Sequence, residues 1–202
     1  MGNGMKMSNS TLQFGTFLSD EYDKLRQLVF DLDLGLWNNF QQLLRKRPDK
    51  ISARFNLTEP VVNELVSYHV DLKKLASGVF ISFRLLNKDF LDVNKFLMID
   101  KKNFLFKKIS YLDISFWYIL KRLALVDISV SMLCFSVPQS VAKWATTASD
   151  DELYLAAIGT VDNLVLRYPV DFIQNILIGE NKNNSVFQRM IYPTSNYLIR
   201  SH

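Results

Sequence analysis

The chain has 202 residues, 49% of them hydrophobic, and its 24 Lys and Arg against 20 Asp and Glu give a net charge of +4. This apolar content excludes wholesale disorder, and the weak positive charge permits a nucleic-acid partner without indicating one. One cysteine, Cys134, excludes an internal disulfide framework and is typical of a reducing compartment.

The sequence also gives no sign of export or of membrane insertion. Residues 1–8 contain no apolar run of the kind found in a secretory signal. Charged residues interrupt every apolar region well before the ~18 residues that a membrane span needs. We therefore expect a cytoplasmic protein with no membrane contact.

Residues 1–18 are rich in Gly, Asn, Ser and Thr, and this composition predicts a flexible N-terminus. A first helical unit is predicted over residues 19–99. Its long first helix opens near Ser19 and ends before Pro48, because the residue before a proline disfavours helical geometry. Gly35 interrupts the apolar spacing and predicts a kink or a break.

Shorter elements follow in this unit. A helix is expected over Asp49–Phe55, then one capped by Thr58, then another that starts at Asp71. Residues 79–86 have the β-branched and aromatic composition of a strand, but their apolar positions continue the helical spacing. We therefore expect a helix there, and a Lys-rich connector over residues 98–108.

A second helical unit is predicted over residues 109–178. Its first helix, Tyr111–Leu125, is apolar almost all round and should be the most buried element. Two short helices, Asp127–Phe135 and Pro138–Thr147, come next. Ser149 should cap a helix with three acids in its first turn, and Val170–Leu177 should form the last helix. Residues 179–202 form an apolar C-terminal tail that should pack back or contact a partner.

The stretch from Ser131 to Trp144 has the pattern of a helix-turn-helix. Apolar residues end a first short helix, Ser136 and Val137 make a tight turn, and Pro138 suits the start of the next helix. This second helix places Gln139, Ser140 and Lys143 on the face opposite Val141 and Trp144. The alternative is an ordinary helical hairpin within a bundle.

The same pattern occurs a second time, 80 positions earlier. A gapless shift of 80 places Phe55 on Phe135 and Trp37 on Trp117, and it also places Asp33 on Asp113. We interpret the chain as all-α, with two tandem copies of a helix-turn-helix-containing unit. The two tryptophans should occupy equivalent buried positions, and so should Phe55 and Phe135.

The helix from Asp113 to Leu123 resembles the opening helix of the flagellar master-activator subunits, FlhD and FlhC. In that family an Asp-Ile start leads to an Arg-Leu pair, here Arg122 and Leu123, and a helix-turn-helix-like pair follows, here residues 127–147. The resemblance covers residues 111–168 and, more loosely, 31–86. It implies an all-α transcriptional activator that works as an oligomer, often with a second regulator subunit. Related activators are carried by integrating conjugative elements and conjugative plasmids.

Two features depart from that family. Its subunits are not obviously doubled as this chain is. The FlhC partner carries a four-cysteine zinc site, which Cys134 alone cannot build.

The residues that carry chemistry in enzymes are not arranged for catalysis here. His69 and His202 lie in no metal-ligand spacing, and no Gly-rich loop precedes a helix to hold phosphate. We therefore expect no enzyme activity, no metal and no cofactor. Two classes remain: a promoter-binding activator, and a helical adaptor in a secretion or conjugation apparatus.

The predicted DNA-binding residues fall in both copies. In the second copy, Gln139, Ser140 and Lys143 suit base edges and phosphate. In the first copy, basic side chains cluster around the helix that should cross the DNA backbone; these are Arg45, Arg47, Lys50 and Arg54. Glu59 and Glu64 on the following helix would repel phosphate. The apolar tail and the apolar face of residues 170–177 further predict self-association or a partner subunit.

Overall fold

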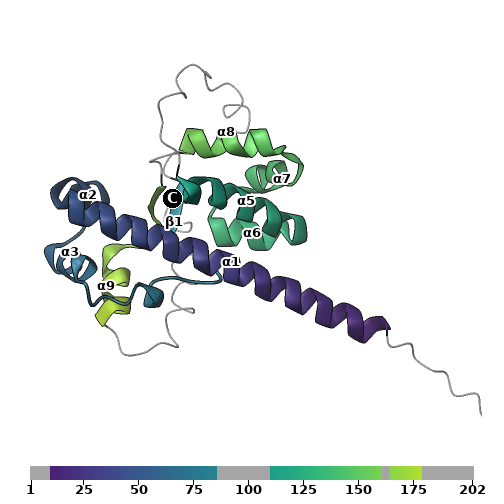
Figure 1. The fold of residues 1–202 in the computed structure, drawn as a ribbon, viewed down its shortest axis with the longest axis horizontal. Coiled ribbons are helices and arrows are strands. Elements are labelled where there is room, and N and C mark those ends of the chain that lie inside the picture. Colours follow the sequence, from purple (N-terminus) through teal and green to yellow (C-terminus); the bar gives the residue numbers. More distant parts are fainter. Residues whose placement is uncertain (1–9, 86–109, 161–163, 179–202) are drawn as a thin grey trace, which may run out of the picture.

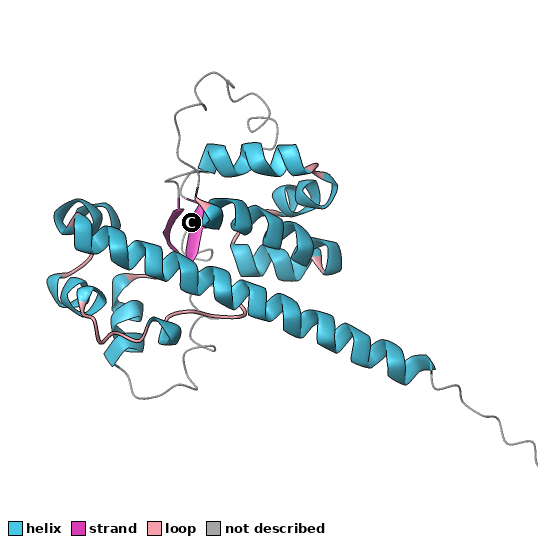
Figure 2. Cartoon of the chain, in the orientation of Figure 1, coloured by secondary structure: helices cyan, strands magenta, loops and turns pink. Residues whose placement is uncertain are grey.

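A computed structural model describes residues 10–85, 110–160 and 164–178 of the chain (Figure 1). These residues are mostly helical, with one two-stranded antiparallel sheet between the helices (Figure 2). The expected all-α character is therefore confirmed, with a small sheet added. The expectations for the connector and for the C-terminal tail fall outside the described residues.

The long helix α1, Ser10–Lys46, runs past the rest of the molecule at its N-terminal end (Figure 1). From Leu25 onward it buries one apolar face, which includes Trp37 and Leu44. It begins at Ser10, so the helix start predicted near Ser19 is wrong. The expected break at Gly35 is also wrong, since α1 continues through it.

Gly35 serves close packing between helices. A Cβ atom at this position would lie 2.7 Å from Cδ2 of Leu112, which belongs to α5. The missing side chain therefore lets α5 approach α1, and this approach joins the two halves of the fold.

Two short helices follow the end of α1. The first, α2 (Pro48–Phe55), ends at Asn56, which adopts the left-handed conformation with φ 51°. The second, α3 (Glu59–Val66), has Thr58 at its N-cap, although the side chain makes no capping hydrogen bond. The predicted boundaries of α2 and the predicted start of α3 are confirmed to within a residue.

The next segment differs from the prediction. Residues after Asp71 form only a single 3₁₀ turn, η1 (Leu72–Lys74), and Phe83–Leu85 forms the strand β1. The reason is Asp33, a buried residue of α1 whose carboxylate accepts hydrogen bonds from the backbone N–H groups of Ser77 and Ser82. Those two donors are thereby withdrawn from any helical ladder, and the chain turns into a strand.

The second half of the fold is organised around α5, Tyr111–Val126, which packs against α1, α6, α7 and α8. Ser110 and Asp113 form a capping box at its start, with each side chain bound to the other residue's backbone N–H. Trp117 and Leu120 are fully buried within it. The prediction that this helix is the most buried element is wrong, because six of its sixteen residues are buried against six of the eleven residues of α8 (Asp150–Thr160).

Four helices and one strand follow α5 in the described residues. The helices are α6 (Ile128–Phe135), α7 (Gln139–Thr147), α8 (Asp150–Thr160) and α9 (Val170–Ile178), and the strand β2 (Leu164–Leu166) lies between the last two. Ser149 and Glu152 form the expected reciprocal cap of α8, and the hydrogen bonds from Ser149 lower the pKa of the Glu152 carboxyl.

The two halves meet at several places. The strands β1 and β2 pair antiparallel, with Phe83 opposite Leu166. The carbonyl of Cys134 at the end of α6 accepts hydrogen bonds from the backbone N–H of Ile81 and from the guanidinium of Arg167. Helix α9 packs back on α3, with Phe172 and Ile173 buried. The apolar face of α9, which we expected to seek a partner, is therefore largely used within the chain.

Two helix ends of the first half are repeated in the second half 80 residues later, which is the shift used to align the two halves of the sequence. Lys46 and Val126 end α1 and α5, and the left-handed residues Asn56 and Ser136 end α2 and α6. In each case the two positions are 80 residues apart. Trp37 and Trp117 are both buried, whereas Phe55 is only partly buried and Phe135 fully so. Phe55 packs against Phe40 of α1, and Phe135 packs against Phe116 of α5.

Candidate nucleic-acid interface

The helix pair α6 and α7 is joined by a tight, well-packed turn. Ser136 has φ 54°, a left-handed conformation that reverses the chain, and Val137 is buried beneath the turn. Pro138 lies at the N-cap of α7, whereas the sequence predicts it at the first residue of the helix. Val141 is fully buried against the core, and Trp144 packs edge-on against Trp117 with ring centroids 5.8 Å apart.

The opposite face of α7 is exposed and polar. Gln139, Ser140 and Lys143 are all exposed, as the sequence predicts. A helix that is anchored by one buried face and presents short polar and basic side chains on the other can be inserted into a groove without disturbing its own packing.

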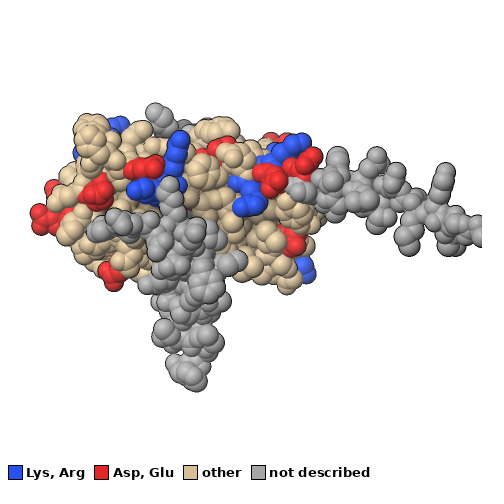
Figure 3. Space-filling model, turned by 90° about the horizontal axis from the view of Figure 1, so that it is seen from below, with Lys and Arg blue, Asp and Glu red and all other residues tan. Residues whose placement is uncertain are grey.

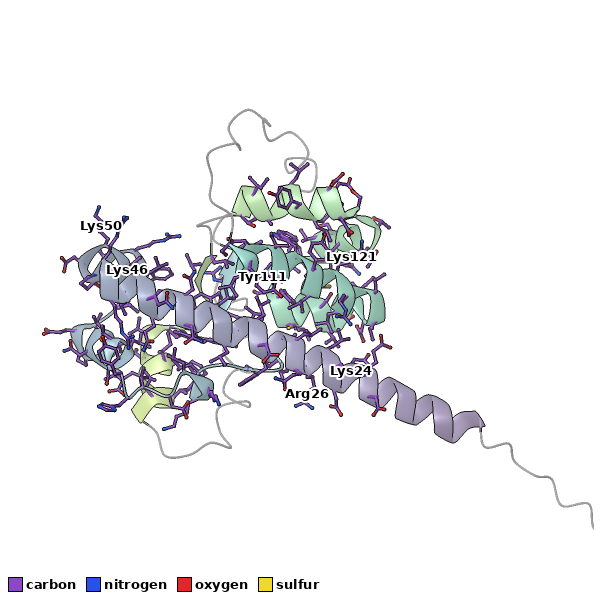
Figure 4. The ribbon with its side chains drawn as sticks, viewed as in Figure 1. Lys24, Arg26, Lys46, Lys50, Tyr111 and Lys121 are labelled. Atoms are coloured by element: carbon purple, nitrogen blue, oxygen red, sulfur yellow. The ribbon has the colours of Figure 1, made fainter. Side chains whose placement is uncertain are left out.

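A lysine from α5 fixes the far end of α7. The ammonium of Lys121 donates a 2.6 Å hydrogen bond to the carbonyl of Ala148, the residue that ends α7 (Figure 4). The corresponding position 80 residues earlier is Gln41, whose amide donates to the carbonyls of Leu65 and Ser67 at the end of α3. The C-terminal ends of α3 and α7 are thus each hydrogen-bonded to a side chain of the long helix that begins the same half of the fold.

The predicted basic cluster of the first half lies at the corner between α1 and α2. Lys46, Arg47, Lys50 and Arg54 are exposed there, and Figure 4 shows Lys46 and Lys50 on this corner. We call these four residues the basic corner. The mutual proximity of their positive charges, on a surface that also carries Asp49, favours an anionic partner over an apolar one.

Arg45 differs from the prediction. It is half-buried, and its guanidinium donates to the carbonyls of Val66 and Ser67 at 3.0 and 3.1 Å. The same group lies 4.3 Å from the ring centre of Tyr68. Arg45 therefore helps to hold the end of α3, and it is not directed outward like its neighbours.

The predicted residues form two separate surfaces. Helix α2 lies at the left of the molecule, whereas α7 lies at the upper right of its compact part, beside α8 (Figure 1). Between them no single basic face stands out in the view from below, where Lys and Arg are interspersed with Asp and Glu (Figure 3). In α3, Glu59 and Glu64 are exposed, so this helix is a poor match for phosphate.

Sequence reasoning missed the residues that hold these surfaces in place. Asp33, Gln41 and Lys121 form hydrogen bonds with backbone groups far away in sequence. The only sequence feature that could have indicated these bonds is the alignment of Gln41 with Lys121 at the 80-residue shift. Arg167 was also missed, because its partner carbonyl belongs to a different element.

Cys134 is a buried residue of α6, and burial raises the pKa of its thiol to about 12. The group therefore stays protonated and inaccessible near neutral pH. We expect a thiol-specific reagent at pH 8 to leave the folded protein unmodified and to label one thiol per chain in denaturant. Stoichiometric labelling without denaturant would contradict this placement.

Comparison of the chain with protein-family models, with curated proteins and with solved structures finds no match. Within the described ranges, no group of three or more His, Cys, Asp and Glu side chains is placed to hold a metal ion. In the same part of the chain, no helix combines the length and the apolar character that crossing a bilayer requires.

Proposed function

We propose that this protein is a transcriptional regulator that binds promoter DNA through the helix pair α6 and α7. The observation that carries the proposal is the division of α7 into an apolar face packed on the core and an exposed face with Gln139, Ser140 and Lys143. A glutamine can pair bidentately with adenine, and a lysine can reach phosphate or guanine. The chain would then contain two tandem helix-turn-helix units, of which the second reads sequence.

The first unit has a different role in this proposal. Glu59 and Glu64 make α3 unsuitable for a DNA groove, whereas Arg47, Lys50 and Arg54 at the basic corner suit the phosphate backbone. The resemblance of residues 111–168 to the flagellar master activators supports the same class of function, an activator that works at promoters as an oligomer.

The proposal is tested by salt-titrated DNA binding of two sets of variants. Gln139→Ala should relax the sequence preference at one base position, at a cost of about 1–3 kcal/mol. Arg47→Ala and Lys50→Ala should weaken binding to all sequences and reduce the salt dependence by roughly one unit of slope per phosphate contact. The DNA would be the upstream regions of the genes that flank its own.

The matched control is Lys24→Ala, which removes one exposed positive charge from α1, away from both surfaces (Figure 4). It should leave affinity and salt slope nearly unchanged. If the protein is instead a helical adaptor, none of the variants will alter DNA binding. Absence of measurable affinity at low salt, with the products of neighbouring genes present, would end the activator proposal.

A further inference from the structure

The exposed face of α7 includes a fourth residue, Thr147, at the end of the helix. An α-helix turns by about 100° per residue, which places the exposed residues of α7 within one arc of about 100°. In order around the helix they are Gln139, Lys143, Thr147 and Ser140. Val141, on the opposite side, is completely buried. Thr147 therefore shares one face with the residues that we propose to read DNA.

The side chain of Thr147 offers an apolar group on this polar face. Its hydroxyl donates a 3.1 Å hydrogen bond to the carbonyl of Trp144, one turn earlier in the same helix. The hydroxyl proton is thereby used within the protein, and the γ-methyl group is the part of the side chain left for an apolar contact. The other exposed residues of this face, Gln139, Ser140 and Lys143, contain no methyl group.

The charge at this end of α7 favours a base over a phosphate as the partner of Thr147. Asp150 and Asp151 are exposed in the first turn of α8, which follows α7 directly in the chain. Their carboxylates repel phosphate groups, whereas an apolar contact with a base edge needs no positive charge on the protein. The chemistry of this end of α7 therefore suits the apolar part of a base edge.

The C5-methyl group of thymine is the apolar group that a base pair presents in the major groove, and a threonine methyl group is one of its usual contacts. We propose that Thr147 is a specificity-determining residue that selects thymine through contact between the two methyl groups. This inference rests on the proposed function, because it requires α7 to lie in the major groove. At a rise of about 1.5 Å per residue, Thr147 lies about 12 Å along the helix from Gln139, or about three to four base-pair steps. The selected thymine should lie at that separation from the base that Gln139 reads.

The test begins with the selection of preferred sites from a random-sequence DNA duplex library by the full-length protein. Each thymine of the preferred site is then replaced in turn by uracil, which differs only in lacking the C5-methyl group. One replacement, about three to four base pairs from the position that Gln139→Ala relaxes, should weaken binding of the wild-type protein about fourfold, the value of one buried methyl group. The same replacement should leave the affinity of Thr147→Ser unchanged, because this variant keeps the hydroxyl but has no methyl group.

Two further variants tie the result to the methyl group at this position. Thr147→Val keeps a methyl group and loses the hydroxyl, so its affinity should still fall on the replacement. Thr58→Ser is the matched control, because Thr58 is exposed at the start of α3 and its side chain makes no capping hydrogen bond. It should keep the fourfold loss.

Two outcomes overturn this inference and leave the proposed function intact. The first is an equal loss on uracil replacement in Thr147→Ser and in the wild-type protein. The second is sequence-specific binding by the wild-type protein that no uracil replacement weakens. Absence of measurable DNA affinity at low salt would refute the proposed function and this inference together.

Discussion

Replacement of Trp117 by Ala should lower the free energy of unfolding by about 3–5 kcal/mol, the cost of removing a large aromatic side chain from a packed core. Trp117 is fully buried, its ring packs edge-on against Phe116 and Trp144, and its indole N–H donates a 3.0 Å hydrogen bond to the hydroxyl of Thr160. The loss is a large part of the ~5–15 kcal/mol that stabilises a typical domain.

Urea denaturation followed by circular dichroism measures this effect. Tyr154→Ala provides the control, because Tyr154 is a large aromatic residue on α8 that is exposed and should cost little. Trp37→Ala, the corresponding change in the first half, should cost less than Trp117→Ala, because Trp37 is as deeply buried but its indole N–H makes no hydrogen bond. A loss below about 1 kcal/mol for Trp117→Ala would contradict the packing described above.

The second large effect is expected for Asp33→Ala. The Asp33 carboxylate accepts hydrogen bonds from the backbone N–H groups of Ser77 and Ser82 at 2.9 and 2.7 Å, and from the Ser82 hydroxyl at 2.8 Å. Each buried donor left without an acceptor costs about 1–3 kcal/mol, so two backbone donors give a loss of about 2–6 kcal/mol.

Asp113→Ala is the matched control for this change, because Asp113 is the residue 80 positions later. Its carboxylate completes a cap at the start of α5, where removal costs about 1 kcal/mol. Chemical denaturation of both variants distinguishes the two roles. Equal losses would show that Asp33 does not anchor the segment between Ser77 and β1. Hydrogen exchange at the N–H of Ser82 should rise in Asp33→Ala alone.

The sequence predicted well wherever a single local signal decided the structure. Pro48, the Ser149 cap and the apolar spacing of residues 111–125 placed the corresponding helix boundaries to within one or two residues. The exposed face of α7 was predicted for the same reason, since three-four spacing alone separates Gln139 and Lys143 from Val141.

The failures occurred where distant parts of the chain decide the outcome. The apolar spacing of residues 72–86 is compatible with a helix, but Asp33 captures the backbone of this segment and β2 pairs with its end. The role of Arg45 was missed because its partner carbonyls belong to α3. Gly35 was predicted to be a kink or a break because sequence spacing contains no information about the approach of Leu112.

The antiparallel pairing of β1 with β2 has a consequence for any attempt to divide the chain. Each half contributes one short strand, so a fragment that contained only one half would expose an unpaired strand edge. In the intact chain the two strands are tethered, and their encounter is governed by an effective concentration that dilution cannot reduce. The same pairing between separate fragments would depend on total protein concentration. The covalent linkage thus converts what would be an assembly equilibrium into a step of folding.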